Sequence, residues 1–334
     1  MAGGGPGGLA AAIHAARAGM RVVLVEPRAG PIDKACGEGL MPRGVAALHA
    51  LGVAPPGMPF RGIRYLDGAH VAQAAFPDGC GLGVRRVVLH EAMLRRADAL
   101  GVERVTGVVE GIAQDTAGVV ARLASGEQRS ASWLVVADGL HSRLRAGLGL
   151  ASVTRWPRRY GIRRHFQRAP WSDLVEVYWG PRGEAYVTPV GPDTVGVALL
   201  FSGKQRFDAL LEDFPALRAR LDDAACGDAA GAGPFARWAA RRQVGRVFLV
   251  GDAAGFLDPL TGEGVRLAVE AAGAAVTCML RNRPRDYDPL WRRMAWRYWT
   301  LTSLLLTVGR LPALRARLVG FLARWPGIMR VGLA

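Results

Sequence analysis

The pattern of apolar and polar residues at the start of the chain predicts a helix followed by a buried strand. Small apolar residues dominate positions 9–18, and they favour a helix that packs closely on a sheet. Gly19 provides a stop, and the apolar run at 21–26 then predicts a strand. This order of elements is typical of an α/β fold with a parallel sheet.

Later segments divide into two kinds. Buried strands at 133–137 and 247–250 continue the parallel type, together with helices at 87–100 and from Gly264 onward. Short stretches rich in aromatic and β-branched residues between 154 and 200 instead predict an antiparallel sheet. We therefore expect a discontinuous Rossmann-like nucleotide-binding domain at 1–150 and 243–285, an inserted antiparallel substrate domain at 151–242 and a helical region at 286–334.

Composition narrows the classes of partner. The net charge is +15, but the arginines are dispersed and only two lysines are present, so nucleic acid is not the expected partner. An anionic cofactor, an acidic substrate or a membrane surface fits the charge better. The four cysteines and six histidines lack metal-ligand spacing, so we expect no metal site. No apolar leader precedes the glycine-rich start, so we expect a cytoplasmic location, with membrane association as an addition.

The glycine-rich start is the first candidate site. Gly3, Gly5 and Gly8 form a GxGxxG turn, with Pro6 inside it, at the beginning of the predicted helix. Such a turn lets a pyrophosphate approach the backbone at a helix N-terminus. Glu26 ends the following strand, where an acid binds the ribose hydroxyls of a dinucleotide. These residues together predict a bound dinucleotide.

The position of this turn is anomalous. A central parallel strand should precede Gly3, yet only Met1 and Ala2 do. A missing strand would leave its neighbours without hydrogen-bond partners. We therefore expect a truncated first strand and a natural start upstream.

Two later motifs, together with the glycine turn, resemble the flavin-dependent monooxygenases of the para-hydroxybenzoate hydroxylase class. One is the DGxxSxxR segment that begins at Asp138, and the other is the GD segment containing Asp252, followed by Pro259, Gly262 and Gly264. The resemblance implies FAD, with Asp252 on the ribityl chain and backbone N–H groups at 262–264 beside the flavin ring. A helix N-cap is the alternative role of Asp252.

The same resemblance suggests two further cofactor contacts. Arg86 heads the helix after the first crossover, where an arginine reaches the pyrophosphate; Arg85 is the alternative, and either side chain can simply be solvated. Asp138 is expected to brace a loop near FAD and near a transient nicotinamide cofactor. A purely structural turn is its alternative role.

The segment around Cys36 is similar to the Cys-Gly-x-Gly segment of the geranylgeranyl reductase family. Its glycines would let the backbone pass close to a flat ring, which makes Cys36 and Glu38 the catalytic candidates. The alternative for Cys36 is a buried small residue without chemistry. The alternative for Glu38 is a helix cap or a salt bridge. Lys34 and Arg43 are candidates to hold a phenolate or phosphate, against simple solvation. No histidine stands out as a general base.

The C-terminal region mixes tryptophans, arginines and aliphatic residues at 291–325. Its uncharged run at 298–309 is 12 residues long, well short of the ~20 that a spanning helix needs. The composition suits helices in a membrane interface, the walls of a hydrophobic substrate tunnel, or ordinary helices packed on the core.

These features predict an FAD-dependent oxidoreductase, with NAD(P)H as transient reductant. A monooxygenase that hydroxylates an aromatic or polyketide-like hydrophobic substrate is the first hypothesis. The alternatives are a flavin-dependent reductase of isoprenoid double bonds and a degenerate, non-catalytic flavoprotein fold. The sequence leaves the substrate, the choice of NADH or NADPH and the oligomeric state open.

Overall fold

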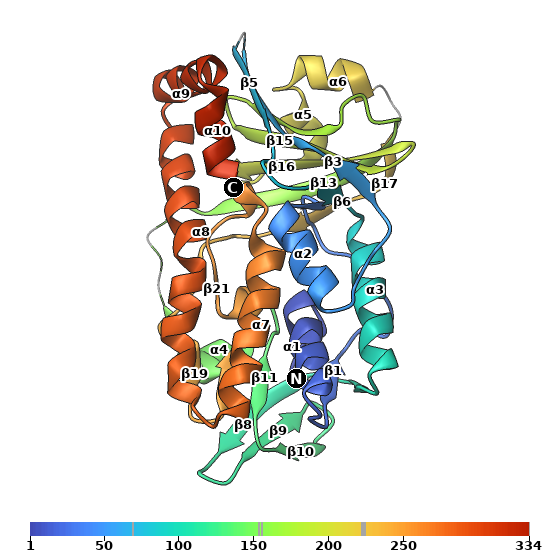
Figure 1. Cartoon of the computed structure of the whole chain (residues 1–334), viewed down its shortest axis with the longest axis vertical. Helices are drawn as coiled ribbons and strands as arrows, with labels where there is room; N and C mark the ends of the chain where they lie inside the picture. Colours follow the sequence, from blue (N-terminus) through green and yellow to red (C-terminus); the bar gives the residue numbers. More distant parts are fainter. Residues whose placement is uncertain (69, 153, 155, 222–224, 334) are drawn as a thin grey trace.

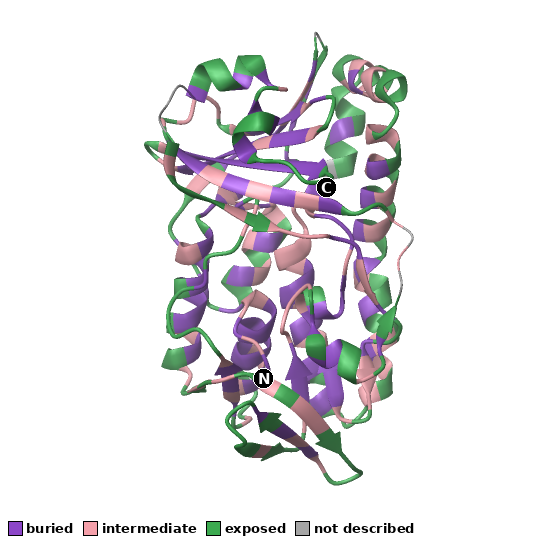
Figure 2. Cartoon of the chain, turned by 180° about the vertical axis from the view of Figure 1, so that it is seen from behind, coloured by how far each residue is buried: buried purple, intermediate pink, exposed green. Residues whose placement is uncertain are grey.

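The computed structural model describes residues 1–68, 70–152, 154, 156–221 and 225–333. Two halves lie one above the other, and a long helix, α8 (Tyr287–Gly309), runs along the side of both (Figure 1). The lower half carries the parallel strands and their helices, and the upper half carries a large, mainly antiparallel sheet. Buried residues line the inner faces of the elements in both halves (Figure 2).

The lower half is built on a small sheet that is parallel except for its edge strand β19 (Gln243–Val244). Its strands, in spatial order, are β7 (Glu103–Thr106), β1 (Val23–Glu26), β11 (Leu134–Val136), β20 (Val247–Leu249) and β19. Residues 1–3 lie between β1 and β11, where Ala2 forms parallel bridges to both Val25 and Val136. This short segment occupies the place of the central strand, and the expectation of an upstream start stays a prediction.

Helices cover this sheet because their small side chains allow close packing. Helix α1 (Pro6–Arg17) contacts α3 (Arg86–Ala99) and α7 (Gly264–Leu280), and the alanines at 10–12 are fully buried. A small antiparallel sheet also belongs to this half; its strands are β8 (Val109–Gln114), β9 (Val119–Leu123) and β10 (Gln128–Ala131).

The large sheet has seven strands and extends beyond the predicted insert. Their order is β17 (Ala225–Ala232), β13 (Arg159–Gln167), β16 (Thr194–Ser202), β15 (Gly183–Gly191), β14 (Leu174–Trp179), β4 (Gly62–Asp67) and β5 (His70–Ala75). The hairpin β4–β5 comes from the segment assigned to the nucleotide-binding domain, so that boundary is corrected. It joins this sheet because β4 pairs in parallel with β14 and Ile63 is buried beside Val175 and Val177.

The remaining elements are short connections. The small strands are β2 (Gly39–Leu40), β3 (Met58–Phe60), β6 (Gly81–Gly83), β12 (Ala151–Ser152), β18 (Arg237–Ala239) and β21 (Gly255–Phe256). The short helices are α2 (Pro42–Ala50), α4 (Arg143–Gly147), α5 (Phe207–Leu211), α6 (Pro215–Leu221), η1 (Gly251–Ala253), η2 (Pro259–Thr261) and η3 (Pro284–Asp286).

The C-terminal region forms three helices, α8, α9 (Pro312–Arg324) and α10 (Pro326–Leu333). One stripe of α8 is buried at helical spacing, formed by Tyr287, Trp291, Ala295, Tyr298, Thr302 and Leu306. Helices α9 and α10 contact β5 at the edge of the large sheet. One side of α8 therefore packs on the core like an ordinary helix, which was one of the three roles expected for this region.

Candidate flavin site

The glycines of the first turn have distinct steric roles. Gly3 has a φ of +104°, and a Cβ there would lie 2.4 Å from the Ala137 carbonyl oxygen. A Cβ at Gly8 would lie 1.9 Å from the Gly3 carbonyl oxygen. A Cβ at Gly5, in contrast, would meet nothing within 4 Å. Gly3 and Gly8 thus allow tight packing of the turn, whereas Gly5 leaves open the space in which a pyrophosphate would approach.

Both polar groups of the Gly4 peptide are fixed by side chains. Its N–H donates to Glu26 Oε2 at 2.7 Å, and its carbonyl lies 2.7 Å from His90 Nε2. The Ile32 N–H donates to His90 Nδ1, so Nε2 carries the proton that is donated to Gly4. Burial lowers the pKa of His90, which keeps the ring neutral. Sequence reasoning missed His90, although it lies one helical turn after Arg86.

Glu26 keeps its charge at this position. Burial alone would raise its pKa, but hydrogen bonds from Arg28 and from the Gly4 N–H outweigh burial and lower it. The Arg28 Nε lies 2.7 Å from Glu26 Oε1. The carboxylate is thus ionised at the end of β1 and retains lone pairs for a ligand.

The predicted cofactor residues gather around one cavity of about 460 Å³. Those that line it are Gly3, Gly5, Pro6, Glu26, Arg86, Asp138, Asp252, Pro259, Gly262 and Gly264. Gly8 packs beneath the turn instead. Residues from five separate segments converge here, and most of them follow the carboxyl ends of the parallel strands, which meet at one edge of the sheet.

Two buried polar atoms at this cavity have no hydrogen-bond partner among the described residues. They are Arg86 Nε and Asp138 Oδ1. Arg86 is buried at the start of α3 and lines the cavity, whereas Arg85 is exposed and does not. Unsatisfied buried polar atoms are rare in folded proteins, and these fit a polar ligand such as FAD.

Arg145 connects the second and third motifs. Its Nη1 donates to the carbonyls of Asp252 at 3.2 Å and Ala253 at 3.0 Å, and its Nη2 donates to Leu140 at 3.0 Å. Ser142 caps the short helix α4 by accepting from the Arg145 N–H. Asp138 Oδ2 accepts from the Leu144 N–H at 3.2 Å. The motif therefore braces the two turns against each other, which gives Asp138 the structural part of its expected role.

Asp252 faces the cavity from the first turn of η1. Its carboxylate makes no hydrogen bond with the described residues, so the alternative role as a helix N-cap is not observed. Asp252 is exposed to the cavity; the loss of solvent contact on its protein side raises the pKa of Asp252, and the nearby Lys34 and Arg86 oppose that shift. An unengaged carboxylate at this place can accept hydrogen bonds from ribityl hydroxyls. Gly262 then closes η2 with a φ of +67°.

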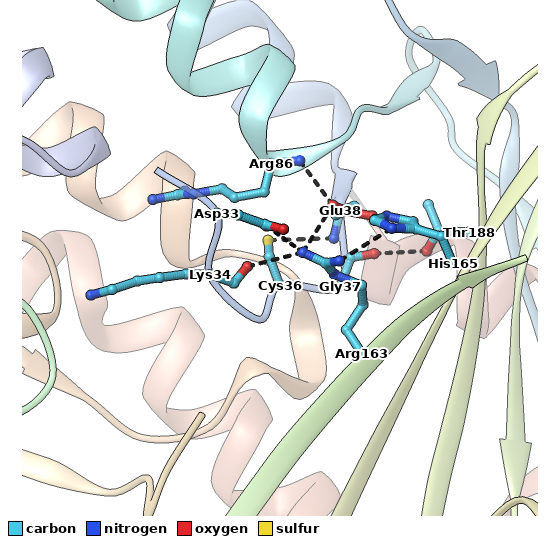
Figure 3. A network of polar contacts seen from close by, with 9 residues as sticks. All are labelled: Asp33, Lys34, Cys36, Gly37, Glu38, Arg86, Arg163, His165 and Thr188. Atoms are coloured by element: carbon cyan, nitrogen blue, oxygen red, sulfur yellow. Dashed lines mark hydrogen bonds and ion pairs between the residues drawn. The ribbon is translucent and has the colours of Figure 1, made fainter. Parts of the chain in front are cut away.

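Glu38 lines the flavin cavity and also belongs to a buried network of polar contacts (Figure 3). Its Oε1 accepts from the Arg86 N–H at 2.8 Å, and its Oε2 lies 2.7 Å from His165 Nε2. Arg163 Nη1 lies 3.2 Å from His165 Nδ1, and a guanidinium only donates, so Nδ1 accepts and Nε2 donates to Glu38. Glu38 thus both caps α3 and anchors its loop, which are the alternatives to a catalytic role.

The same network ties the loop at 33–38 to the large sheet. Arg163 on β13 also pairs with Asp33, and Thr188 Oγ1 on β15 donates to the Gly37 carbonyl at 2.8 Å. Figure 3 shows the ends of Lys34 and Arg86 pointing away from these contacts. The Cys36 Sγ accepts from the Glu38 N–H at 3.4 Å, and burial raises the pKa of the Cys36 thiol, so it stays protonated.

Two smaller cavities adjoin the first. One of about 310 Å³ lies beside Lys34 and Cys36, and one of about 250 Å³ reaches α8; Gly37 and Pro259 line all three. Arg43 borders only the 250 Å³ cavity, so the structure separates it from Lys34. The walls of these two smaller cavities are largely apolar, which suits a hydrophobic substrate.

Comparison with known proteins agrees with this site. Residues 1–176 match the family described as FAD binding domain. The chain belongs to this family of flavoproteins. A menaquinone reductase of Mycolicibacterium smegmatis is 31% identical over 93% of this chain and 84% of its own length. A digeranylgeranylglycerophospholipid reductase of Methanothermobacter thermautotrophicus is 28% identical over 87% and 81%, respectively.

The fold is also that of known flavoproteins. The crystal structure of p-nitrophenol 4-monooxygenase from Pseudomonas putida superposes with a TM-score of 0.85 at 22% identity, covering 99% of this chain and 95% of that one. The predicted resemblance and the predicted FAD are confirmed, and the chain is an FAD-dependent oxidoreductase. The hypothesis of a non-catalytic fold has no support here, because similar proteins are named reductases and monooxygenases.

Proposed function

We propose that this flavoprotein reduces a carbon–carbon double bond of an isoprenoid, quinone-like substrate, with NAD(P)H as the source of electrons. When bound and reduced by NAD(P)H, the flavin would supply a hydride to one carbon and return to its oxidised form, and the protein must provide a proton to the other carbon. The protein's tasks are to hold the substrate in an apolar cavity, to exclude water and to provide that proton.

The groups that line the 310 Å³ cavity carry this proposal. Burial raises the pKa of Cys36 and holds that of Tyr186 well above its ordinary value, so both side chains keep their protons. His141 lies 3.0 Å from the Gly233 carbonyl, and Arg163 is engaged in the buried network. The cavity thus holds a thiol and a phenol in their protonated forms, and the raised pKa makes each a weak acid that gives up its proton only to the strongly basic carbon left by hydride transfer. The named activity of the menaquinone reductase and the Cys36 segment point the same way.

Hydroxylation is the second candidate, because the three motifs that resemble the monooxygenases surround the flavin cavity. One assay separates the two reactions. The FAD-loaded chain is mixed with NADH or NADPH and a short-chain menaquinone under argon and under air. After the quinone ring has been reoxidised in air, reduction of the side chain predicts a product that still carries two added hydrogen atoms, whichever atmosphere was used for the reaction. A product that gains one oxygen atom, and forms only in air, would replace the proposal with hydroxylation.

Substitutions in the two smaller cavities test which of them binds the substrate. Ala198 lines the 310 Å³ cavity and Val175 lines the 250 Å³ cavity. Ala198→Phe is expected to lower kcat/KM for the quinone and to leave FAD absorbance unchanged. Val175→Phe is the matched control, with a smaller effect on the same quantity. The opposite order would assign the substrate to the cavity beside α8.

A further inference from the structure

We infer that the outer side of α8–α10 docks on an anionic lipid bilayer. Of the large hydrophobic side chains that are exposed among the described residues, ten belong to this region. They are Leu290, Trp296, Leu301, Leu304, Leu311, Leu314, Phe321, Trp325, Ile328 and Val331. We call these ten residues the apolar tail surface. Exposed apolar side chains gathered in one part of a protein indicate an interaction site.

The apolar tail surface continues along one face of a helix. Leu290, Leu301 and Leu304 on α8 share that face with Arg293 and Arg297, at intervals of three, four or seven residues. The opposite stripe of α8 is buried in the core. Figure 1 shows α8 along the edge of the molecule, with α9 and α10 beside its upper end. The described helices include none that is both long and apolar enough to cross a membrane, so the contact would be peripheral.

The charge of the C-terminal region indicates which kind of partner covers the apolar tail surface. The chain from residue 289 to 334 contains eight arginines and no aspartate, glutamate or lysine. Two of the eight are already ion-paired, Arg292 with Asp288 and Arg315 with Asp67, and Arg293, Arg297 and Arg317 are exposed. Arginines flanking exposed tryptophan and leucine side chains match the interface of an anionic bilayer, where the apolar groups insert and the guanidinium groups meet phosphates. A second copy of the chain is a poor occupant, because a symmetric contact would place these arginines against each other.

The apolar tail surface is also continuous with a cavity that adjoins the flavin site. Arg297, Leu301 and Leu305 of α8 and Gly332 of α10 line the 250 Å³ cavity. This cavity shares Gly37 and Pro259 with the flavin cavity. Docking through α8 would therefore bring this wall of the cavity close to the lipid. The docking itself does not depend on which reaction the flavin carries out.

Vesicle sedimentation tests the inference. The FAD-loaded full chain is centrifuged with vesicles of phosphatidylcholine alone and of phosphatidylcholine with phosphatidylglycerol. We expect binding to the anionic vesicles that weakens as salt is added. Trp296→Glu/Leu304→Glu/Trp325→Glu should weaken binding by more than about tenfold, since charges replace the inserting groups. Leu280→Glu, at an exposed leucine of α7, is the control and should bind as the unchanged chain does.

A second pair of variants tests the charge. Arg293→Gln/Arg317→Gln should weaken binding to anionic vesicles by about 25-fold, at about fivefold per arginine. Arg21→Gln, at an exposed site far from the tail in sequence, is the control. FAD absorbance and melting temperature verify that each variant is folded. Three results would overturn the inference. The unchanged chain could fail to bind anionic vesicles, or the glutamate variant could bind them equally well. The third is that the unchanged chain forms a dimer and binds no vesicles, while the glutamate variant is a monomer.

Discussion

The glycine turn offers a matched pair of methyl additions that separates FAD binding from folding. At Gly5, φ is −68° and ψ is 178°, which alanine adopts readily, and the added methyl meets no atom within 4 Å. Gly5→Ala should therefore leave the free energy of unfolding of the apoprotein unchanged or raise it by about 0.4–1 kcal/mol. The methyl would occupy the space for the pyrophosphate. Overpacking of about 1–3 kcal/mol corresponds to an FAD affinity that is about 5- to 150-fold weaker.

Gly8→Ala should behave in the opposite way. Its methyl would lie 1.9 Å from the Gly3 carbonyl oxygen, so the turn must move by about 1 Å inside a packed contact. We expect the apoprotein to lose about 1–3 kcal/mol of stability. Urea denaturation of the apoproteins gives the stabilities, and quenching of flavin fluorescence gives the affinities. An affinity for FAD in Gly5→Ala equal to that of the unchanged chain would refute the assignment of this turn to the pyrophosphate.

Three other predictions follow from the contacts around the cavity. Arg86→Met should weaken FAD binding by about 2 kcal/mol, measured by the same titration, whereas Arg85→Met should not. Burial lowers the pKa of His90, so as pH falls below 6.5 this side chain becomes protonated in the unfolded chain but not in the folded one. The urea midpoint should therefore decline below pH 6.5, and it should decline less in His90→Gln. Arg145→Met leaves three carbonyls without their donor and should lower stability by about 3 kcal/mol in thermal melts; an unchanged melting temperature would contradict the bracing role.

The predicted cofactor residues lie close together in the structure because they obey local rules. A tight turn needs glycine at Gly3, and the acid at Glu26 follows its strand at a set distance. The parallel sheet then brings segments as distant as Asp138 and Asp252 to one edge. The motifs and the family resemblance therefore identified residues of which all but Gly8 line the same cavity.

The contacts that the sequence did not predict depend on tertiary pairing. Glu38 and His165 are 127 residues apart, and no local pattern aligns a loop with one residue of β13. The hairpin β4–β5 was assigned to the wrong half for the same reason, because its parallel partner β14 lies far along the chain. His90 lies four positions after Arg86, which is a weak signal that it faces the same site. Its contact with the Gly4 carbonyl could not be predicted, because that carbonyl is positioned only once the glycine turn has folded.

The buried network gives Glu38 a role that neither motif spacing nor exposure would indicate. Gly37 lines all three cavities, and it is held between Thr188 on β15 and the Glu38 contacts to α3 and β13. A movement of the sheet relative to α3 must strain these hydrogen bonds or move Gly37. The shape of the junction between the flavin cavity and the two smaller cavities is therefore set by how the two halves pack. Glu38 fixes the position of Gly37 at this junction through its contacts to both halves.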